Sequence, residues 1–582
     1  MTTLQWPVEP TCPRNGIARP AAVRRMTIAA GVTLLVAATL GLRLFQAGHW
    51  SFWGDELVTY YDASMLFKTS YWHPTGYSSP HEQFIHACPL GFGILGVWHD
   101  LVPKSELTAR LPLVLFSTLG VLTAVWLVWR SRGPWVAAAL VAVLIAWPWG
   151  LFHAQNHRPY SIAFFFAVFG FLLADAGFAR HDWRRLCAAT AFCLLAALSH
   201  SSCVLLLAVL TGWQMCKIAT DRCHRQRGHW VAAAVMLAAL AVDCLLIRHF
   251  TRGFMQGAWW YMLPERCLAS LVNNLTLPIS LAALAAGVWV VATRQRHLYW
   301  AVLCSMAVTV ACVLGPLVMS FRADYVFAMT LPLHLLAAVA LGRVAQTAWQ
   351  HHWSLGLAAL GAVPALILPS IASYYVDGNR PDYRTAAAFV AARAQPGDVL
   401  WSRQCVNVRY YLSTPRADLY PADPVAAVDE LLQQGRRVWC VMAYSTGGIP
   451  PQRLAWLSKR FRLVGDVHPL RFDYHQNGVA VLLAEADAAA ETAATTDSKV
   501  ARRPSVAPSW PHGEVLNSAV FADRRAKVAP PAGWSLTEKR VDKERCYRTA
   551  LGRSGRERNP AGTTICGAAL DRQTGGRPIP ER

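Results

Sequence analysis

The sequence predicts a polytopic α-helical membrane protein that carries a small α/β domain near its C-terminus. Of its 582 residues, 54% are hydrophobic and only 15% are charged, whereas soluble globular proteins carry about 25% charged residues. Long apolar segments alternate with clusters of Lys and Arg, as in membrane proteins that keep basic loops in the cytoplasm. From residue 376 onward the composition changes to that of a soluble domain, with helical and strand-like segments in alternation.

Eleven apolar segments are predicted to cross the membrane, each near the length of about 20 residues that a bilayer requires. They cover residues 26–46, 110–129, 135–152, 159–179, two short spans within 185–218, 229–248, 278–293, 298–319, 325–342 and 354–373. The segment Pro89 to Leu101 is too short to span and is predicted to lie along the interface. With this count nearly every basic cluster falls on the side of the N-terminus, which predicts a cytoplasmic N-terminus and an extracytoplasmic C-terminus.

The predicted organisation has four parts. Residues 1–25 form a cytoplasmic N-terminal arm, and residues 26–375 form the membrane domain, with a first extracytoplasmic loop at 47–109. Residues 376–487 form the extracytoplasmic α/β domain, with helices near 384–393, 425–434 and 451–461 and strands beginning at 399, 437 and 479. Residues 488–582 are rich in Ala, Thr, Pro and Arg and are predicted to be a disordered tail.

The net charge of +21 does not indicate a nucleic-acid-binding protein. The basic residues lie between apolar segments and in the tail, which is the positive-inside distribution and not a binding stripe. The 15 cysteines show no zinc-like spacing, and most lie inside apolar segments, where they act as small hydrophobic residues. Membrane lipids are therefore the expected surroundings of this chain, and no nucleic acid is expected as a partner.

Unusual polar residues are predicted to gather at one membrane face. The predicted topology places these residues on the extracytoplasmic side: Asp55, Glu56, Glu82, His86, His157, Arg158, His200, Arg322 and Asp324. Ionisable groups near a membrane are costly, so such a gathering indicates a functional cavity. The alternative is that these residues are ordinary polar loop ends.

Two short motifs carry the most chemical information. The adjacent carboxylates of Asp55 and Glu56 follow the first predicted span directly. In the segment His157-Arg158-Pro159-Tyr160, the proline suits the first turn of a helix. A helix N-terminus beside an arginine is a site for an anion. The alternatives are a solvated pair of loop carboxylates and an arginine that extends to the membrane interface.

Together these motifs resemble those of the GT-C superfamily, membrane glycosyltransferases that use sugars linked to a lipid phosphate. The superfamily includes protein O-mannosyltransferases and lipid A aminoarabinose transferases. The resemblance covers roughly residues 26–485, and its further segments are Glu106 to Pro112, Ser199-His200, Arg322 to Tyr325, Arg380 to Arg384, Pro396 to Asp398 and Tyr410-Tyr411. One segment departs from the family pattern: bacterial relatives often have Asp or His before Pro-Pro-Leu, where this chain has His86-Ala87-Cys88-Pro89-Leu90.

The resemblance implies transfer of a sugar from a polyprenyl-phosphate donor to a hydroxyl of a protein, lipid or polysaccharide, with inversion at the sugar carbon. It implies that Asp55 is the catalytic carboxylate and that Glu56 orients it or helps to hold a metal. The residues expected to contact the donor phosphate are Arg158, His157, Tyr160, His86, Glu82, His200, Arg322 and Tyr325. The expected location is a bacterial inner membrane, with the active site on the periplasmic side.

Three questions stay open at this point. A divalent ion would need oxygen ligands such as Asp55 and Glu56, but two carboxylates do not establish one. A transporter or flippase of lipid-linked saccharides would also be polytopic, although no internal repeat of the kind found in transporters is evident. A third alternative is a membrane-anchored binding protein whose activity resides in residues 376–487, a region without a metal or nucleophile motif.

Overall fold

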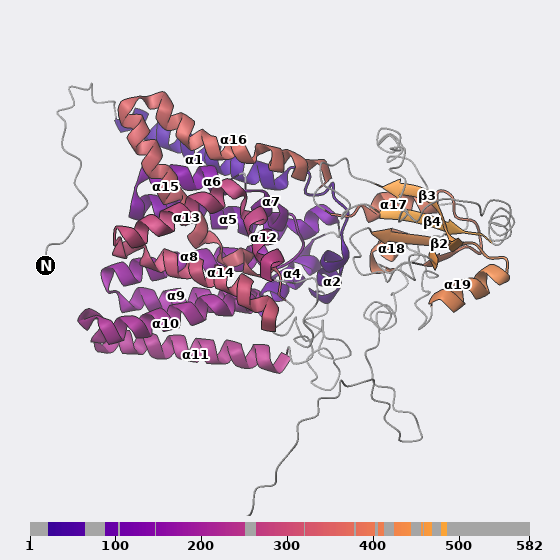
Figure 1. The fold of residues 1–582 in the computed structure, drawn as a ribbon, viewed down its shortest axis with the longest axis horizontal. Helices are drawn as coiled ribbons and strands as arrows, with labels where there is room; N and C mark the ends of the chain where they lie inside the picture. Colours follow the sequence, from indigo (N-terminus) through magenta and orange to yellow (C-terminus); the bar gives the residue numbers. More distant parts are fainter. Residues whose placement is uncertain are drawn as a thin grey trace, which may run out of the picture.

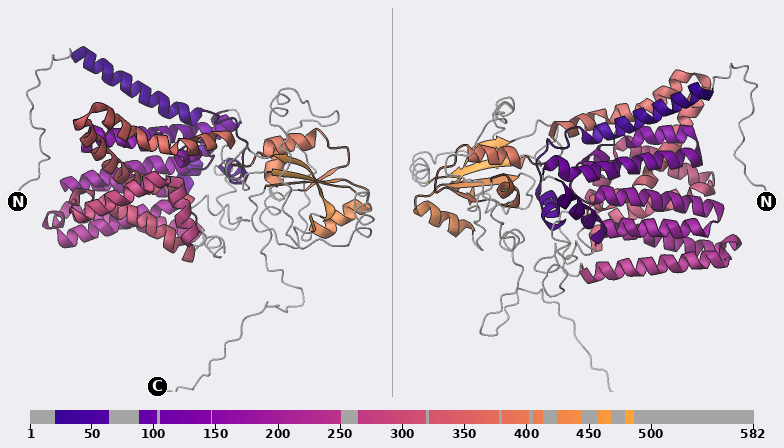
Figure 2. Two further views of the ribbon diagram at one scale, coloured as in Figure 1. Left: turned by 45° about the horizontal axis from the view of Figure 1, so that its top comes forward. Right: turned by 180° about the vertical axis from the view of Figure 1, so that it is seen from behind.

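The structure is a computed structural model that describes residues 21–63, 88–102, 105–145, 147–250, 264–318, 321–377, 380–401, 405–412, 424–443, 456–457, 459–467 and 479–485 (Figure 1). A bundle of long helices forms one part, and a small mixed sheet with its helices lies beyond one end of that bundle (Figure 2). The mostly helical membrane fold with a small α/β unit is therefore confirmed.

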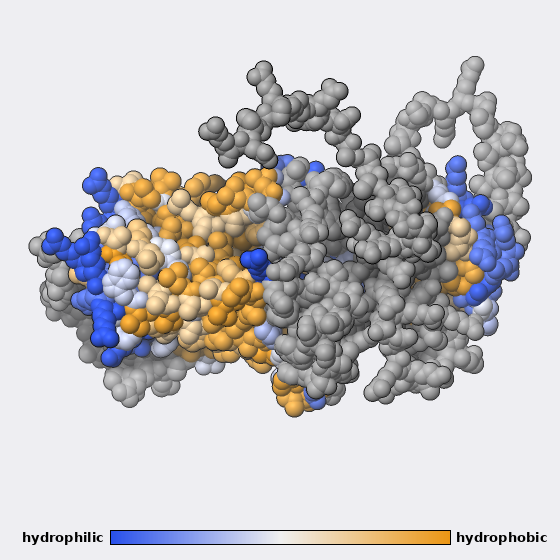
Figure 3. Space-filling model, turned by 90° about the horizontal axis from the view of Figure 1, so that it is seen from below, coloured by the Kyte–Doolittle hydropathy of each residue, from blue (hydrophilic) through white to orange (hydrophobic). Residues whose placement is uncertain are grey.

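The bundle contains these helices: α1 (Ala21–Leu44), α5 (Glu106–Arg132), α6 (Pro134–Leu144), α7 (Pro148–Ala154), α8 (Tyr160–Arg180), α9 (Trp183–Ser199), α10 (Val204–Thr220), α11 (Arg227–Phe250), α12 (Pro264–Leu275), α13 (Leu277–Ala292), α14 (Tyr299–Val318), α15 (Leu331–His351) and α16 (Trp353–Asp377). Seven of the described helices are long and apolar enough to cross a membrane, or up to nine spans if each bent pair counts as one. Figure 3 shows the apolar band over the bundle, with hydrophilic residues at one end.

Each of the eleven predicted segments coincides with a helix or a bent helix pair, but the count of eleven spans and their direction through the membrane stay predictions. One boundary was wrong. The predicted span 325–342 is displaced, because residues Ala323–Met329 form the 3-10 helix η5 and α15 begins only at Leu331. Pro332 at the start of α15 suits a first helical turn, where no backbone N–H is needed. The segment Pro89–Leu101 forms the short helix α4, as predicted.

Two of the membrane helices are interrupted by sharp bends. The α6–α7 pair bends by 66° and the α12–α13 pair by 101°. The buried Arg43 of α1 donates a hydrogen bond to the carbonyl of Leu144, at the C-terminal end of α6, at 3.4 Å. The same guanidinium also donates to Ser117 Oγ at 2.9 Å. An apolar environment leaves no water for such groups, so the arginine stabilises the break.

The C-terminal unit is a four-stranded sheet in the order β1-β2-β4-β3, with β1 (Val399–Trp401) parallel to β2 (Val438–Ala443). Strand β4 (Val479–Ala484) pairs antiparallel with β2 on one side and with β3 (Arg462–Val467) on the other. Helices α17 (Tyr383–Ala391) and α18 (Cys405–Leu412) share a core with one face of the sheet, and α19 (Pro424–Gln433) with the other. Strand β3 was not predicted from the sequence.

The C-terminal unit contacts the segment that follows α1. Ser51 Oγ donates to the carbonyl of Pro381 at 2.8 Å, and the backbone N–H of Phe52 donates to the Tyr411 hydroxyl at 2.6 Å. Asn407 closes the same junction with a bond to the carbonyl of Phe52 at 3.0 Å. These contacts hold the sheet against the end of the bundle where α2 (Gly54–Ala63) and α4 lie, called the α2 end below (Figure 1).

Candidate active site

Asp55 and Glu56 lie in the first turn of α2, where acidic residues are favoured by the helix dipole. Successive residues on an α-helix point about 100° apart. The two side chains therefore point in different directions, and Glu56 is fully buried, whereas Asp55 is half-buried. The two carboxylates therefore have different surroundings, although they are adjacent in sequence.

Glu56 is the centre of a buried network of ion pairs. Arg110 of α5 donates a hydrogen bond to each carboxylate oxygen of Glu56, from Nε to Oε1 at 2.9 Å and from Nη2 to Oε2 at 2.8 Å. Arg380 approaches the same carboxylate at 3.4 Å, and the backbone N–H of His157 donates to Oε1 at 2.7 Å. Burial alone would raise the pKa of Glu56, but the two guanidiniums and these hydrogen bonds outweigh it and hold the pKa below its usual value. Glu56 is thus a charged structural group.

Arg110 connects the same network to the backbone. Its Nη1 donates to the carbonyls of Ala47 and Trp50, and its Nη2 donates to the carbonyl of Ser51. A guanidinium carries five N–H donors, and Arg110 uses them on the carboxylate and on the chain that leads into α2. The network fixes the position of α2, and with it the position of Asp55.

Asp55 differs from its neighbour in having no ion pair or side-chain hydrogen bond to any residue of the described part of the chain. Its charge nevertheless acts on two arginines from other segments, Arg158 and Arg322, and on Tyr325. A half-buried carboxylate near two cations, with no bonded partner in the described part of the chain, is available to accept a proton or bind a hydroxyl group.

Arg158 precedes α8 and is almost fully buried. Its Nη1 donates to Thr59 Oγ1 at 3.1 Å, and it is hydrogen-bonded to Tyr160. Burial would lower the pKa of Arg158, but the charge of Asp55 and the polar neighbours more than offset this and raise it. A permanently charged guanidinium at the start of a helix is well suited to bind an anion.

Arg322 adds a second cation beside Asp55. Its Nη2 lies 3.0 Å from Asp324, and its side chain is 48% exposed. The nearby Asp324 raises the pKa of Arg322, with Asp55 adding to the effect. Asp324 also accepts a hydrogen bond from Trp149 at 3.3 Å, which ties this segment to α7. The greater exposure of Arg322 indicates a more mobile contact than that of Arg158.

His200 and Tyr325 complete this side of the site. The ring of His200 lies 4.4 Å from that of Tyr160 and 6.0 Å from that of Tyr325, and its Nδ1 bonds Ser202 at 2.7 Å. Burial, and then the charge of Arg158, lowers the pKa of His200 to about 3. The imidazole is therefore neutral at physiological pH. The structure places Asp55, Arg158, Tyr160, His200, Arg322 and Tyr325 near one another.

His157 lies apart from this group in its bonding. Its ring is fully buried, with Nδ1 2.8 Å from the carbonyl of Ala109 and Nε2 3.0 Å from His99 Nε2. Burial, and then the nearby His99, lowers the pKa of His157 to about 3. Both ring nitrogens are therefore used within the protein, and the contribution of His157 to the site is the backbone N–H that it gives to Glu56.

Some predicted residues are not placed, and some placed residues were not predicted. Glu82 and His86 lie outside the described residues. Arg110 and Arg380 were not predicted as site residues, although both occur in segments that resemble the family. Their pairing with Glu56 joins positions 54 and 324 residues apart, so no local pattern could reveal it.

The residues around Asp55 do not fit the expected two-carboxylate metal site. Both oxygens of Glu56 already accept hydrogen bonds from Arg110, and Arg380 adds a second positive charge at the same carboxylate. A divalent ion would have to displace these cations to use Glu56. Of this pair, only Asp55 is positioned to offer an oxygen ligand.

Several solved structures are similar to this chain. The archaeal oligosaccharyltransferase AglB from Archaeoglobus fulgidus, in complex with an inhibitory peptide and a dolichol-phosphate, superposes with a TM-score of 0.50 at 11% identity, over 77% of this chain and 74% of its own. ArnT from Cupriavidus metallidurans bound to undecaprenyl phosphate gives a TM-score of 0.47 at 17% identity, over 78% of this chain and 98% of its own. The arabinofuranosyltransferase AftD from Mycobacteria gives 0.40 at 14% identity, over 78% of this chain and 41% of its own.

No protein-family model matches the chain, and no curated protein matches it by sequence. At 11% identity the similarity to AglB shows the fold. The predicted polytopic helical fold with a small α/β unit is therefore the fold of AglB.

Proposed function

We propose that this protein is an integral membrane glycosyltransferase that moves a sugar from a polyprenyl-phosphate donor to an acceptor hydroxyl. The reaction takes place at the α2 end of the bundle, on the extracytoplasmic face, and in a bacterium on the periplasmic side of the inner membrane. The acceptor is a hydroxyl of a protein, a lipid or a polysaccharide. The dolichol-phosphate bound to AglB supports a lipid-phosphate donor, because it is held by a protein of the same fold.

The observation that carries the proposal is the carboxylate of Asp55, which has no ion pair or side-chain hydrogen bond among the described residues and whose charge acts on both Arg158 and Arg322. Sugar transfer from a lipid phosphate needs a base for the acceptor hydroxyl and a cationic site for the leaving phosphate. Asp55 supplies the first, and the two arginines supply the second. A transporter of lipid-linked saccharides would need no such base.

In the proposed step, an oxygen of Asp55 accepts the proton of the acceptor hydroxyl as that oxygen attacks the anomeric carbon. The bond between this carbon and the phosphate oxygen breaks, and its electron pair stays with the lipid phosphate. Arg158 and Arg322 stabilise the charge that develops there. A single displacement of this kind inverts the configuration at the sugar carbon.

Glu56 has a positioning role in this proposal. Its bonds to Arg110 and Arg380 leave it without a free oxygen for the acceptor, but they fix the helix that carries Asp55. The rings of Tyr160, His200 and Tyr325 lie next to one another, and both tyrosines act electrostatically on the two arginines, so these three residues are proposed to contact the donor. His157 contributes through its backbone.

The test is sugar transfer by purified protein in nanodiscs, from a synthetic polyprenyl-phosphate sugar to an envelope extract as acceptor. Asp55→Asn preserves shape but removes the basic carboxylate, so we expect kcat to fall by about 100- to 10,000-fold. Asp100→Asn is the matched control, because Asp100 is exposed on α4 and is not one of the residues placed near Asp55. Transfer by Asp55→Asn at the wild-type rate would refute the role of Asp55.

A further inference from the structure

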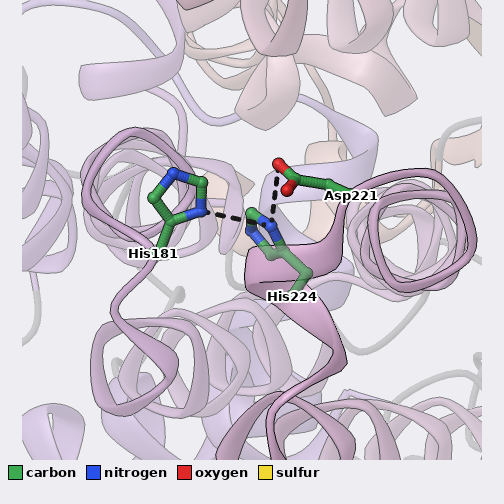
Figure 4. A group of neighbouring side chains, drawn as sticks. All are labelled: His181, Asp221 and His224. Carbon is green, nitrogen blue, oxygen red and sulfur yellow. Dashed lines mark hydrogen bonds and ion pairs between the residues drawn. The ribbon is translucent and has the colours of Figure 1, made fainter. Parts of the chain in front are cut away.

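A second cluster of ionisable side chains is formed by His181, Asp221 and His224 (Figure 4), and it lies at the end of α8 opposite to Arg158. His181 follows α8, and Asp221 and His224 belong to the connection between α10 and α11, which includes the 3-10 helix η3 (Arg222–Arg225). The potential ligand atoms of these three residues all lie within 4.8 Å of one another. The proposed glycosyltransferase mechanism does not use this cluster.

The distances within the cluster match those of a tetrahedral metal site. His181 Nδ1 lies 3.2 Å from His224 Nδ1, and the latter lies 3.3 Å from Asp221 Oδ2. Zinc binds His nitrogen and carboxylate oxygen at about 2.0–2.2 Å, so two ligands of a tetrahedron are about 3.3–3.5 Å apart. The two measured separations therefore have nearly the length of such tetrahedron edges.

The cluster converges on one atom. His224 Nδ1 faces both His181 Nδ1 and Asp221 Oδ2, as the dashed lines in Figure 4 show. A neutral imidazole nitrogen carries either one proton or one lone pair, so His224 Nδ1 cannot make a full hydrogen bond to both neighbours. A cation placed between the three atoms would accept a lone pair from each.

The surrounding residues hold the cluster in this arrangement. His224 is fully buried, and its ring lies against that of His229 at 4.5 Å. His229 Nε2 lies 3.1 Å from the carbonyl of His181, and Gln214 Nε2 donates to the carbonyl of His229 at 3.0 Å. These contacts fix His229, against which the ring of His224 packs, whereas the second ring nitrogen of His224, Nε2, is buried with no hydrogen-bond partner among the described residues.

His181 has an uncommon backbone conformation. It ends α8 with φ of 53°, in the left-handed region, where glycine is the usual residue. Side chains with a Cβ atom are disfavoured in this conformation. The conformation directs its ring toward His224, and strained positions of this kind are often found at binding sites.

We propose that His181, Asp221 and His224 bind a divalent transition-metal ion, and that zinc is the best fit. Two imidazoles and one carboxylate favour zinc over calcium or magnesium, which prefer oxygen ligands. Three protein ligands leave the fourth position to a water molecule. The ion connects the α8–α9 turn to the α10–α11 connection, so it stabilises the packing of these helix ends.

Metal content is the direct test. The full-length protein is purified without a histidine tag, loaded with zinc, dialysed against metal-free buffer and analysed by mass spectrometry for metals. We expect about one zinc per chain for the wild type and less than about a tenth of that for His181→Gln and His224→Gln. His351→Gln is the matched control, because His351 is exposed at the C-terminal end of α15, at the same end of the bundle.

A second measurement separates metal binding from a folding defect. Cobalt(II) replaces zinc and reports its geometry, so the wild type should show the intense visible absorption of a four-coordinate ion. The conservative variant Asp221→Asn keeps the hydrogen bond to Cys223 and should weaken this signal without loss of the monodisperse protein. Wild-type protein that retains no more zinc than the His181→Gln and His224→Gln double variant, or whose cobalt spectrum is that of the hydrated ion, would overturn the proposal.

Discussion

Replacement of Glu56 by Gln should destabilise the protein more than any other single change of a carboxylate at the α2 end. The change leaves Arg110, which is fully buried, and Arg380, which is almost fully buried, without their shared negative charge. Removing one partner of a buried ion pair costs about 3–5 kcal/mol. The glutamine can still accept one hydrogen bond, and Arg110 keeps its backbone carbonyls, so we expect a loss of about 3 kcal/mol in the free energy of unfolding.

Equilibrium unfolding in mixed detergent micelles, followed by tryptophan fluorescence, would measure this loss. The control is Glu485→Gln, because Glu485 pairs with Arg462, whose side chain is 60% exposed. An exposed pair of this kind contributes about 0–1 kcal/mol. If Glu56→Gln were no more destabilising than Glu485→Gln, the buried network would not hold α2 in place, and the positioning role of Glu56 would be wrong.

Three further results are expected. Arg158→Ala should raise the donor KM strongly, and Arg158→Lys should rescue it only partly, because a lysine cannot form the planar bidentate pair with phosphate. Arg322→Ala should raise the KM less, since Arg322 is half exposed. An unchanged donor KM in Arg158→Ala would exclude an anion site at Arg158. Burial lowers the pKa of His157 and His200 to about 3, so the unfolded chain, with histidine near 6.5, binds protons that the folded chain does not. Stability should therefore fall as the pH drops below about 6.5, by up to about 2 kcal/mol per histidine at pH 5, and unfolding midpoints that are equal at pH 7 and pH 5 would contradict this. Finally, a cysteine at the exposed Gln395, in a background without native cysteines, should react with an impermeant reagent from outside the cell; labelling only after permeabilisation would reverse the predicted orientation.

The overall architecture was predictable because its signals are local. Apolar length predicted the long helices of the bundle, and it predicted that Pro89–Leu101 is a helix too short to span, as the 13 residues of α4 are. Hydropathy contains no information on hydrogen-bond geometry. It therefore predicted the start of α15 too early, and it could not predict the 101° bend between α12 and α13.

The site was only partly predictable, for a different reason. The sequence motifs identified Asp55, Arg158 and Arg322, but they could not show which of two adjacent carboxylates turns inward. That choice depends on Arg110 and Arg380, which come from distant parts of the chain and meet only in the folded protein. Glu56 was expected to orient Asp55 or to help hold a metal; its bonds to two arginines agree with the first role and leave no free oxygen for the second.

The charges at the α2 end suggest how the site accommodates the reaction. Among the described residues, Arg110 and Arg380 exceed Glu56 by one positive charge, while Arg158 and Arg322 balance Asp55 and Asp324. The net charge of +1 complements the single negative charge of a lipid-phosphate sugar. In the proposed step Asp55 takes up the acceptor proton, so the net charge of these seven residues becomes +2 as the departing lipid phosphate approaches a charge of −2.

This charge balance leads to a prediction that separates a catalytic from a structural role of Asp55. Asp55→Asn removes one negative charge in advance, so it should bind the product polyprenyl phosphate more tightly than the wild type does, while its turnover falls. Two unit charges about 8 Å apart interact by roughly 2 kcal/mol at an effective dielectric constant of 20, so the affinity should rise by about tenfold or more. Product binding measured in nanodiscs tests this, with Asp100→Asn as the control of equal charge change. A structural role for Asp55 would instead weaken product binding together with turnover, and that result would refute the charge argument.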